Sequence, residues 1–187
     1  MLNKKIGPLF GLVLFLSCLN VSSGEYFFNP EIGRNDAYVS ADLTLTGERV
    51  SQSNPMLSLK FGYQFDTQWV VSGAYSFSTD LLTFGAIDDY KIRNKEISLG
   101  YAFEFSNNFT IEPTVGYNSW ELEVVEGQLF NPGPEDIELY NGDDYFWHLV
   151  TRYKLSLQNF INLTYSKYNY DFGQSEAIKL GFSVYFD

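Results

Sequence analysis

The chain of 187 residues has few of the residue types that build metal sites, redox sites or nucleic-acid surfaces. Its single cysteine, Cys18, and single histidine, His148, exclude an internal disulfide and a zinc site built from cysteine and histidine. Only 12 lysines and arginines stand against 23 aspartates and glutamates, a formal net charge of −11. This acidic balance excludes the basic face that nucleic-acid binding needs.

Long apolar runs are also absent beyond the first twenty residues. Lys4 and Lys5 precede an apolar run over residues 9–16, and small residues follow at 21–24. That order is typical of a secretory signal peptide. We predict a signal peptide over residues 1–24 and one domain over residues 25–187, with Cys18 removed. The alternative is acylation of Cys18, as in a lipoprotein.

Aromatic residues, in contrast, make up 18% of the chain. Since no later segment is apolar and long enough for a membrane helix, a membrane protein of this composition must be a closed β-barrel. The soluble alternative is a secreted sandwich or a lipocalin-like barrel, whose apolar faces would point inward.

Alternating polar and apolar residues predict eight strands. They cover residues 37–46, 56–65, 69–78, 95–105, 109–119, 145–155, 160–168 and 176–186. The breaks between them alternate: residues 66–68, 106–108 and 156–159 are short polar turns, whereas residues 47–55, 79–94, 120–144 and 169–175 are longer. Short periplasmic turns and long extracellular loops are typical of an eight-stranded antiparallel transmembrane β-barrel with both termini in the periplasm.

Aromatic residues near the strand ends support a membrane location, because Trp, Tyr and Phe favour the two bilayer interfaces. One set flanks the short turns and the last strand: Phe65, Trp69, Phe103, Phe105, Phe109, Tyr153, Phe160 and Phe186. The other set lies near the long breaks: Tyr75, Phe77, Tyr117, Tyr145, Trp147 and Tyr165. Leu57, Leu59, Phe61, Ile97, Leu99, Tyr101, Leu163, Leu180 and Phe182 are predicted to face lipid between these two bands.

The final strand carries the family resemblance. Ile178, Leu180, Phe182, Val184 and Phe186 share one face of residues 177–187, with an aromatic residue in the penultimate position. This pattern resembles the closing strand and assembly signal of bacterial outer-membrane barrels, although the aromatic residue is usually last and here Asp187 follows it. The whole domain resembles the small barrels of the OmpX/Ail type and the transmembrane domain of OmpA.

The resemblance implies the outer membrane of a Gram-negative bacterium and insertion by the barrel assembly machinery. It also implies contact with outer-membrane lipids and lipopolysaccharide. The roles it suggests are adhesion or another interaction with a surface or host ligand, and envelope integrity. We expect a monomer.

The opposite face of the strands is predicted to line the lumen. Acids and bases alternate there, and a barrel of eight strands is just wide enough for side chains to fill it, so buried charges must pair. We predict that Asp42, Lys60 and Lys179 lie at one height and that Glu112 pairs with Arg152. The alternative is that these residues line a conducting path.

Catalysis is not predicted. Lipid A-modifying barrel enzymes use a histidine with a serine, but Val150 follows His148 on its face of the strand and Arg152 comes next. No glycine loop for phosphate is present either. A third hypothesis, an OmpW-like conduit for small hydrophobic molecules, remains open.

Charge is uneven in the long breaks. Residues 120–144 hold eight carboxylates without a lysine or arginine: Glu121, Glu123, Glu126, Glu135, Asp136, Glu138, Asp143 and Asp144. The pairs Glu135-Asp136 and Asp143-Asp144 are the candidate ligands for a weakly bound Ca²⁺ or Mg²⁺. Lys91, Arg93 and Lys95 are candidates for contact with lipopolysaccharide phosphates. A simply solvated surface is the alternative for both groups.

Overall fold

The computed structural model describes residues 23–39, 50–78, 89–125 and 137–186, and its regular structure is entirely β. The strands are β1 (Gly24–Val39), β2 (Val50–Phe65), β3 (Trp69–Ser78), β4 (Asp89–Tyr101), β5 (Phe103–Ser106), β6 (Phe109–Val125), β7 (Ile137–Lys154), β8 (Asn159–Tyr170) and β9 (Gly173–Phe186). In the described ranges no helix is long and apolar enough to cross a membrane.

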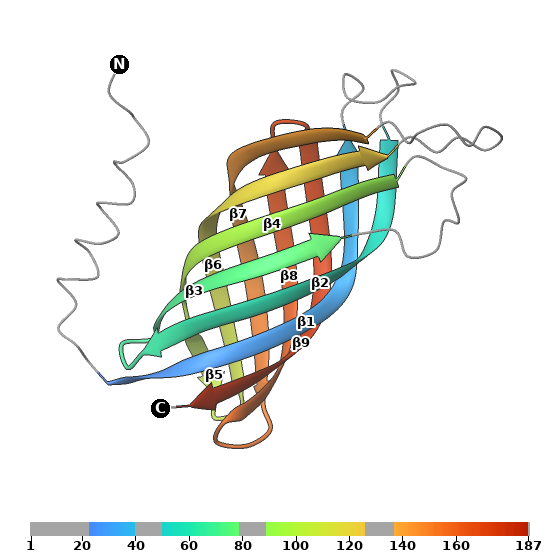
Figure 1. Cartoon of the computed structure of the whole chain (residues 1–187). Coiled ribbons are helices and arrows are strands. Elements are labelled where there is room, and N and C mark those ends of the chain that lie inside the picture. The colour runs from blue at the N-terminus through green and yellow to red at the C-terminus, as the bar shows by residue number, and fades with distance from the viewer. Residues whose placement is uncertain (1–22, 40–49, 79–88, 126–136, 187) are drawn as a thin grey trace, which may run out of the picture.

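The strands close into one antiparallel barrel (Figure 1). Except for β4 and β5, each strand pairs with the next one in sequence, and β1 pairs with β9 to close the ring. β4 and β5 both pair with β6 and are separated only at Ala102, so together they form one interrupted strand. The barrel therefore has eight strands, as the sequence predicts. β1 begins at the same end of the barrel where β9 finishes, because Tyr26 lies opposite Phe186.

The first strand begins earlier than the predicted residues 37–46. β1 runs from Gly24 to Val39, and residues 40–46 of the predicted strand, including Asp42, lie outside the described residues. Asn29, Pro30 and Glu31 resemble a break in the sequence. In the structure the ladder to β2 continues through Pro30, while the ladder to β9 lacks residues 29 and 30. A proline has no N–H for the ladder, which accounts for a local gap on one side.

The strands also extend further than predicted at the end opposite the chain termini. β6 continues to Val125 and β7 begins at Ile137, so much of the predicted loop 120–144 is strand. Asp171 and Phe172 alone connect β8 to β9, where residues 169–175 were predicted to form a longer loop. The prediction fails there because the pattern is reversed: Trp120 and Leu122 face the interior, whereas Glu121 and Glu123 lie on the outer face, where the rest of the barrel is apolar.

The outward face of the barrel is apolar, as predicted. Its exposed residues include Leu57, Leu59, Phe61, Ile97, Leu163, Leu180 and Phe182, while Leu99 and Tyr101 are half-buried on the same face. Most of the predicted interface aromatics also point outward. Phe160 does not: its ring packs against Tyr185 inside the barrel, with the two centroids 4.9 Å apart.

The apolar outer face ends abruptly on three neighbouring strands. Going outward, Ile97 is followed by Lys95 on β4, Tyr117 by Ser119 on β6, and Tyr145 by Asp143 on β7. Beyond this line lie residues 89–95, 119–125 and 137–143, which we call the β4–β6–β7 extension. Because its outer face is polar, the extension stands outside the bilayer core.

Candidate functional site

The lumen near the barrel's turn end is built around Arg152. Its guanidinium contacts the Glu112 carboxylate and donates to Oε1 of Gln64 at 3.2 Å. The cation also lies 5.5 Å from the centre of the Phe27 ring and 5.8 Å from that of Tyr185. Arg152 and Glu112 are both buried, so each removes the desolvation cost of the other. The structure thus brings together the two residues that the sequence analysis paired.

Lys179 has a different partner from the one expected. Its Nζ lies 3.1 Å from Oε2 of Glu31, and both side chains are fully buried. Thr164 donates to the other Glu31 oxygen at 2.6 Å, and buried Lys60 adds positive potential at the same carboxylate. Glu31 therefore occupies the role assigned to Asp42. The misplacement of the first strand is the reason, because Glu31 was not recognised as a strand residue.

The middle of the lumen contains Glu96 and His148. Ser76 and the Tyr168 hydroxyl each donate to Oε1 of Glu96 at 2.9 Å, while His148 Nε2 lies 3.8 Å from the other oxygen. The imidazole packs on Phe146, with ring centroids 4.4 Å apart, and edge-on against Tyr168, with centroids 5.6 Å apart. Ser76 thus bonds to the carboxylate and not to the histidine.

Apolar residues fill the lumen towards the extension. Trp120 packs edge-on against Phe172, with centroids 4.8 Å apart, and Phe172 stacks on Tyr170 at 4.6 Å. Leu122 and Tyr168 are completely buried in the same cluster. We call this cluster the aromatic cap. It separates the charged lumen from the outer end of the barrel.

The outer face of the extension carries a ladder of ion pairs between β4 and β6. Glu123 accepts from Lys91 at 3.0 Å and from Arg93 at 2.9 Å, and Glu121 lies 3.1 Å from Lys95. The hydrogen bond from Lys91, aided by its charge and that of Arg93, holds the pKa of Glu123 below its ordinary value. The expectation of uncompensated acids is therefore wrong for Glu121 and Glu123. The three bases lie just beyond the aromatic band.

The carboxylates proposed as cation ligands are not grouped in the described part of the chain. Asp143 and Asp144 are neighbours in one strand and point to opposite faces, so a single ion cannot bind both. Asp144 instead accepts from the Trp120 indole at 3.0 Å and from the Asp171 amide at 3.1 Å. Glu135 and Asp136 lie outside the described residues, and in those residues no cluster of three or more metal-binding side chains occurs.

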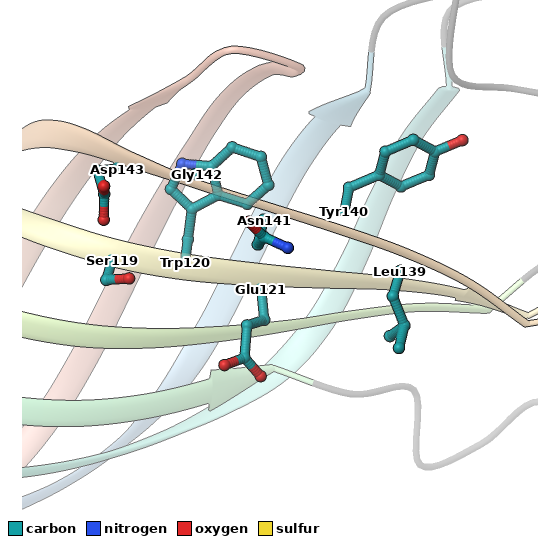
Figure 2. Close-up of a pocket in the computed structure, with 8 residues that line it drawn as sticks. All are labelled: Ser119, Trp120, Glu121, Leu139, Tyr140, Asn141, Gly142 and Asp143. Carbon is teal, nitrogen blue, oxygen red and sulfur yellow. The ribbon is translucent and has the colours of Figure 1, made fainter. Parts of the chain in front are cut away.

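Residues of the paired strands β6 and β7 border a hollow of about 380 Å³ in the extension (Figure 2). It is lined by Ser119, Trp120, Glu121, Leu139, Tyr140, Asn141, Gly142 and Asp143. Trp120 and Tyr140 lie on one side of the two strands, and Glu121 and Leu139 on the other. Gly142 permits this packing, because an added Cβ would come within 2.5 Å of the Trp120 ring. Sequence reasoning missed the hollow, since it assigned these residues to a loop.

Three solved structures share this fold at low sequence identity. Neisserial surface protein A aligns with a TM-score of 0.66 and 14% identity, covering 88% of this chain and 98% of its own. Ail of Yersinia pestis, in complex with the heparin analogue sucrose octasulfate, aligns with a TM-score of 0.58 and 15% identity. The alignment covers 87% of this chain and 99% of Ail. The N-terminal barrel of OprF from Pseudomonas aeruginosa aligns with a TM-score of 0.51 and 14% identity. The alignment covers 88% of this chain and 100% of the OprF barrel.

A search of curated proteins finds no match to this sequence. The family model described as the outer membrane protein beta-barrel domain, however, matches residues 10–186, which is nearly the whole chain. The chain belongs to the outer membrane protein beta-barrel domain family, and it is a barrel protein of the Gram-negative outer membrane.

Proposed function

We propose that this protein is a non-enzymatic surface protein that binds an extracellular partner through the β4–β6–β7 extension and its acidic connections. The aromatic cap is the observation that carries this proposal, because it fills the lumen at the outer end and leaves the extension as the accessible surface. It also argues against the OmpW-like conduit, which needs an open interior. Adhesion, another surface interaction and envelope integrity are the roles compatible with this site.

The charge of the extension selects the partner. Lys91, Arg93 and Lys95 pair with Glu121 and Glu123, and Glu138 and Asp143 add further carboxylates to the same part of the barrel. Glu135 and Asp136 continue the acidic stretch in the sequence. A basic or cation-bridged surface is therefore favoured. The polyanion bound by Ail in its complex would be repelled here.

Lipopolysaccharide contact remains part of the proposal, in a reduced form. A lipid phosphate that approaches Lys91, Arg93 and Lys95 must compete with Glu121 and Glu123, which already form ion pairs with these bases. Lys95 is the most available of the three, since its side chain is 64% exposed. We expect one phosphate contact at Lys95 and not a three-residue phosphate site.

The absence of catalysis is supported by the surroundings of His148. A general base must accept a hydrogen bond from its nucleophile, and Ser76 donates to Glu96 instead. The proposal also includes three further points: cleavage after residue 24, insertion by the barrel assembly machinery and a monomeric barrel.

The test is binding to polymers of opposite charge by the full protein in phosphatidylcholine nanodiscs. We expect wild type to be retained on immobilised poly-lysine and not on heparin. Glu138→Gln with Asp143→Asn should elute at lower salt. The matched control, Asp36→Asn with Glu176→Gln, removes the same charge from the rim on β1 and β9 and should elute like wild type. Equal elution of all three proteins, or retention on heparin, would contradict the proposal.

A further inference from the structure

The turn end of the barrel, which faces the periplasm, contains a cavity of about 660 Å³. Arg152, Lys154, Phe160 and Tyr185 border it, together with residues of the connections after β5 and β7. A barrel of eight strands has just enough room for its own side chains, so an open space of this size needs an explanation. Its volume is that of a pocket for a small ligand. Because the aromatic cap fills the lumen at the other end, the cavity is a pocket and not a passage.

Opposite charges face this cavity without contacting one another. Deeper in the lumen, Lys179 and Glu31 form a buried ion pair. Lys154, Glu25 and Glu104 border the cavity, but none of them forms an ion pair with another residue in the described ranges of the chain. A molecule that carries both charges can supply the missing partners.

The two signs of charge lie on different sides of the cavity. Glu104 on β5 is opposite Thr110 on β6, and Thr110 is opposite Arg152 on β7. β5 and β7 are thus two strand spacings apart, or about 10 Å. Lys154 follows two residues after Arg152 and shares its face of β7. A second hollow, of about 440 Å³, also contains Glu104 but neither of the two bases, so the acidic side is separate from the basic side.

The neutral residues around the cavity suit a peptide. Asn108 and Gln158 border it, and each amide side chain carries both donors and acceptors for the peptide groups of a ligand. Leu157, whose side chain is 82% exposed, adds an apolar contact. Gln68 donates to Oε1 of Glu104 at 3.1 Å, which holds this carboxylate at the cavity before a ligand arrives.

We propose that this cavity binds short peptides with unblocked ends. The carboxylate of the peptide contacts Lys154, and its ammonium group contacts Glu104. An extended tripeptide spans about 10 Å, which matches the separation of β5 and β7. The inference goes beyond the proposed function and is independent of it, because the surface role belongs to the opposite end of the barrel.

The probe is tri-alanine, titrated by isothermal calorimetry into the full protein in phosphatidylcholine nanodiscs. Four forms of the peptide are compared: unblocked, N-acetylated, C-amidated and blocked at both ends. We expect saturable binding of the unblocked form. Each single block should weaken the affinity by about fivefold, because it removes one charge-assisted contact.

Variants assign the two contacts. Lys154→Met should weaken binding of the unblocked peptide by about fivefold and should bind the unblocked and amidated forms equally. Glu104→Gln should bind the unblocked and acetylated forms equally. The matched control, Lys167→Met, removes the same charge from the outer face of β8 and should bind like wild type. Heat-modifiable gel mobility establishes that each variant is folded.

Covalent blocking locates the peptide. In a Cys18→Ser background, Ser106→Cys places a thiol at the cavity, and its reaction with a bulky maleimide should abolish binding. Gln174→Cys, at an exposed position on β9 at the outer end, is the control and should bind after the same reaction.

Four results would overturn the inference. They are no saturable binding at millimolar peptide, equal affinity for the unblocked and doubly blocked peptides, equal losses in Lys154→Met and Lys167→Met, and equal losses on blocking either cysteine. The first two would mean that the charges at the cavity are only solvated. Retention of wild type on poly-lysine tests the proposed function separately and does not depend on any of these results.

Discussion

Lys179 and Glu31 form an ion pair that bridges the first and last strands of the barrel, with Nζ 3.1 Å from Oε2 and both side chains fully buried. The pair lies where β1 and β9 close the ring, beside the gap that Pro30 leaves in the ladder. The side chains thus connect the two strands close to the point where backbone pairing is interrupted.

Lys179→Met leaves Glu31 buried beside Lys60 alone and should destabilise the barrel by about 3–5 kcal/mol. The double variant Lys179→Met with Glu31→Gln should regain much of this loss, because no uncompensated charge remains. Urea unfolding in lipid vesicles, followed by heat-modifiable gel mobility, measures both. Lys167→Met is the control: its pair with Glu176 is partly exposed and should change stability by less than about 1 kcal/mol. Equal effects at the two lysines would contradict the account of the lumen.

Gly142→Val tests the packing of the aromatic cap. The new side chain meets the Trp120 ring, so we expect a loss of about 1–3 kcal/mol and altered tryptophan fluorescence from displacement of the indole. Gly73→Val is the control, since a Cβ added at Gly73 would lie 3.6 Å from the backbone oxygen of Glu96, an ordinary van der Waals contact. Unchanged fluorescence in Gly142→Val would mean that Trp120 does not pack over this glycine.

The Glu123 pairs predict how the extension responds to pH. The pKa of Glu123 is lowered by Lys91 first and Arg93 second, so its ionised form stabilises the folded extension. This stability is fully present above the ordinary pKa of 4.5 and is lost as the pH falls through the lowered folded value. Amide hydrogen exchange in residues 119–125 should therefore be flat down to about pH 4.5 and quicken further into acid, after correction for intrinsic rates. Glu123→Gln should remove this step, and a step of the same size in that variant would assign it to another group.

His148→Ala should leave lipid A unchanged in cells that make the protein, since in the part of the chain that the structure describes neither ring nitrogen of His148 forms a hydrogen bond with a serine. Mass spectra of lipid A from wild-type and variant cells provide the comparison. A modification present only with wild type would identify the protein as an enzyme and refute this part of the proposal.

Sequence alone was informative wherever the barrel meets lipid. There the alternation of residues such as Leu57, Ser58, Leu59 and Lys60 reports both strand and face, because one side must be apolar and the other polar. The Glu112 and Arg152 contact followed from the same parity, once their strands were placed.

Prediction failed where that contrast is reversed, with apolar residues inside and charged residues outside. Beyond the bilayer, Glu121, Glu123 and Asp143 alternate with Leu122 and Gly142, and charged residues on the outer face resemble a loop. The first strand, and with it Glu31, was not predicted because Pro30 has no N–H for the ladder and is uncommon within a strand. The hollow bordered by β6 and β7 depends on how far these two strands extend together, which alternation within one strand does not report.

Single-channel recording in planar lipid bilayers tests the central claim most directly, namely that the lumen is a sealed core and that the protein acts at its outer surface. The purified wild-type barrel should insert and give no stepwise currents, because paired charges and the aromatic cap fill the bore. Stable, unitary conductance from the wild-type protein would contradict the account and return the lumen to consideration as the functional site.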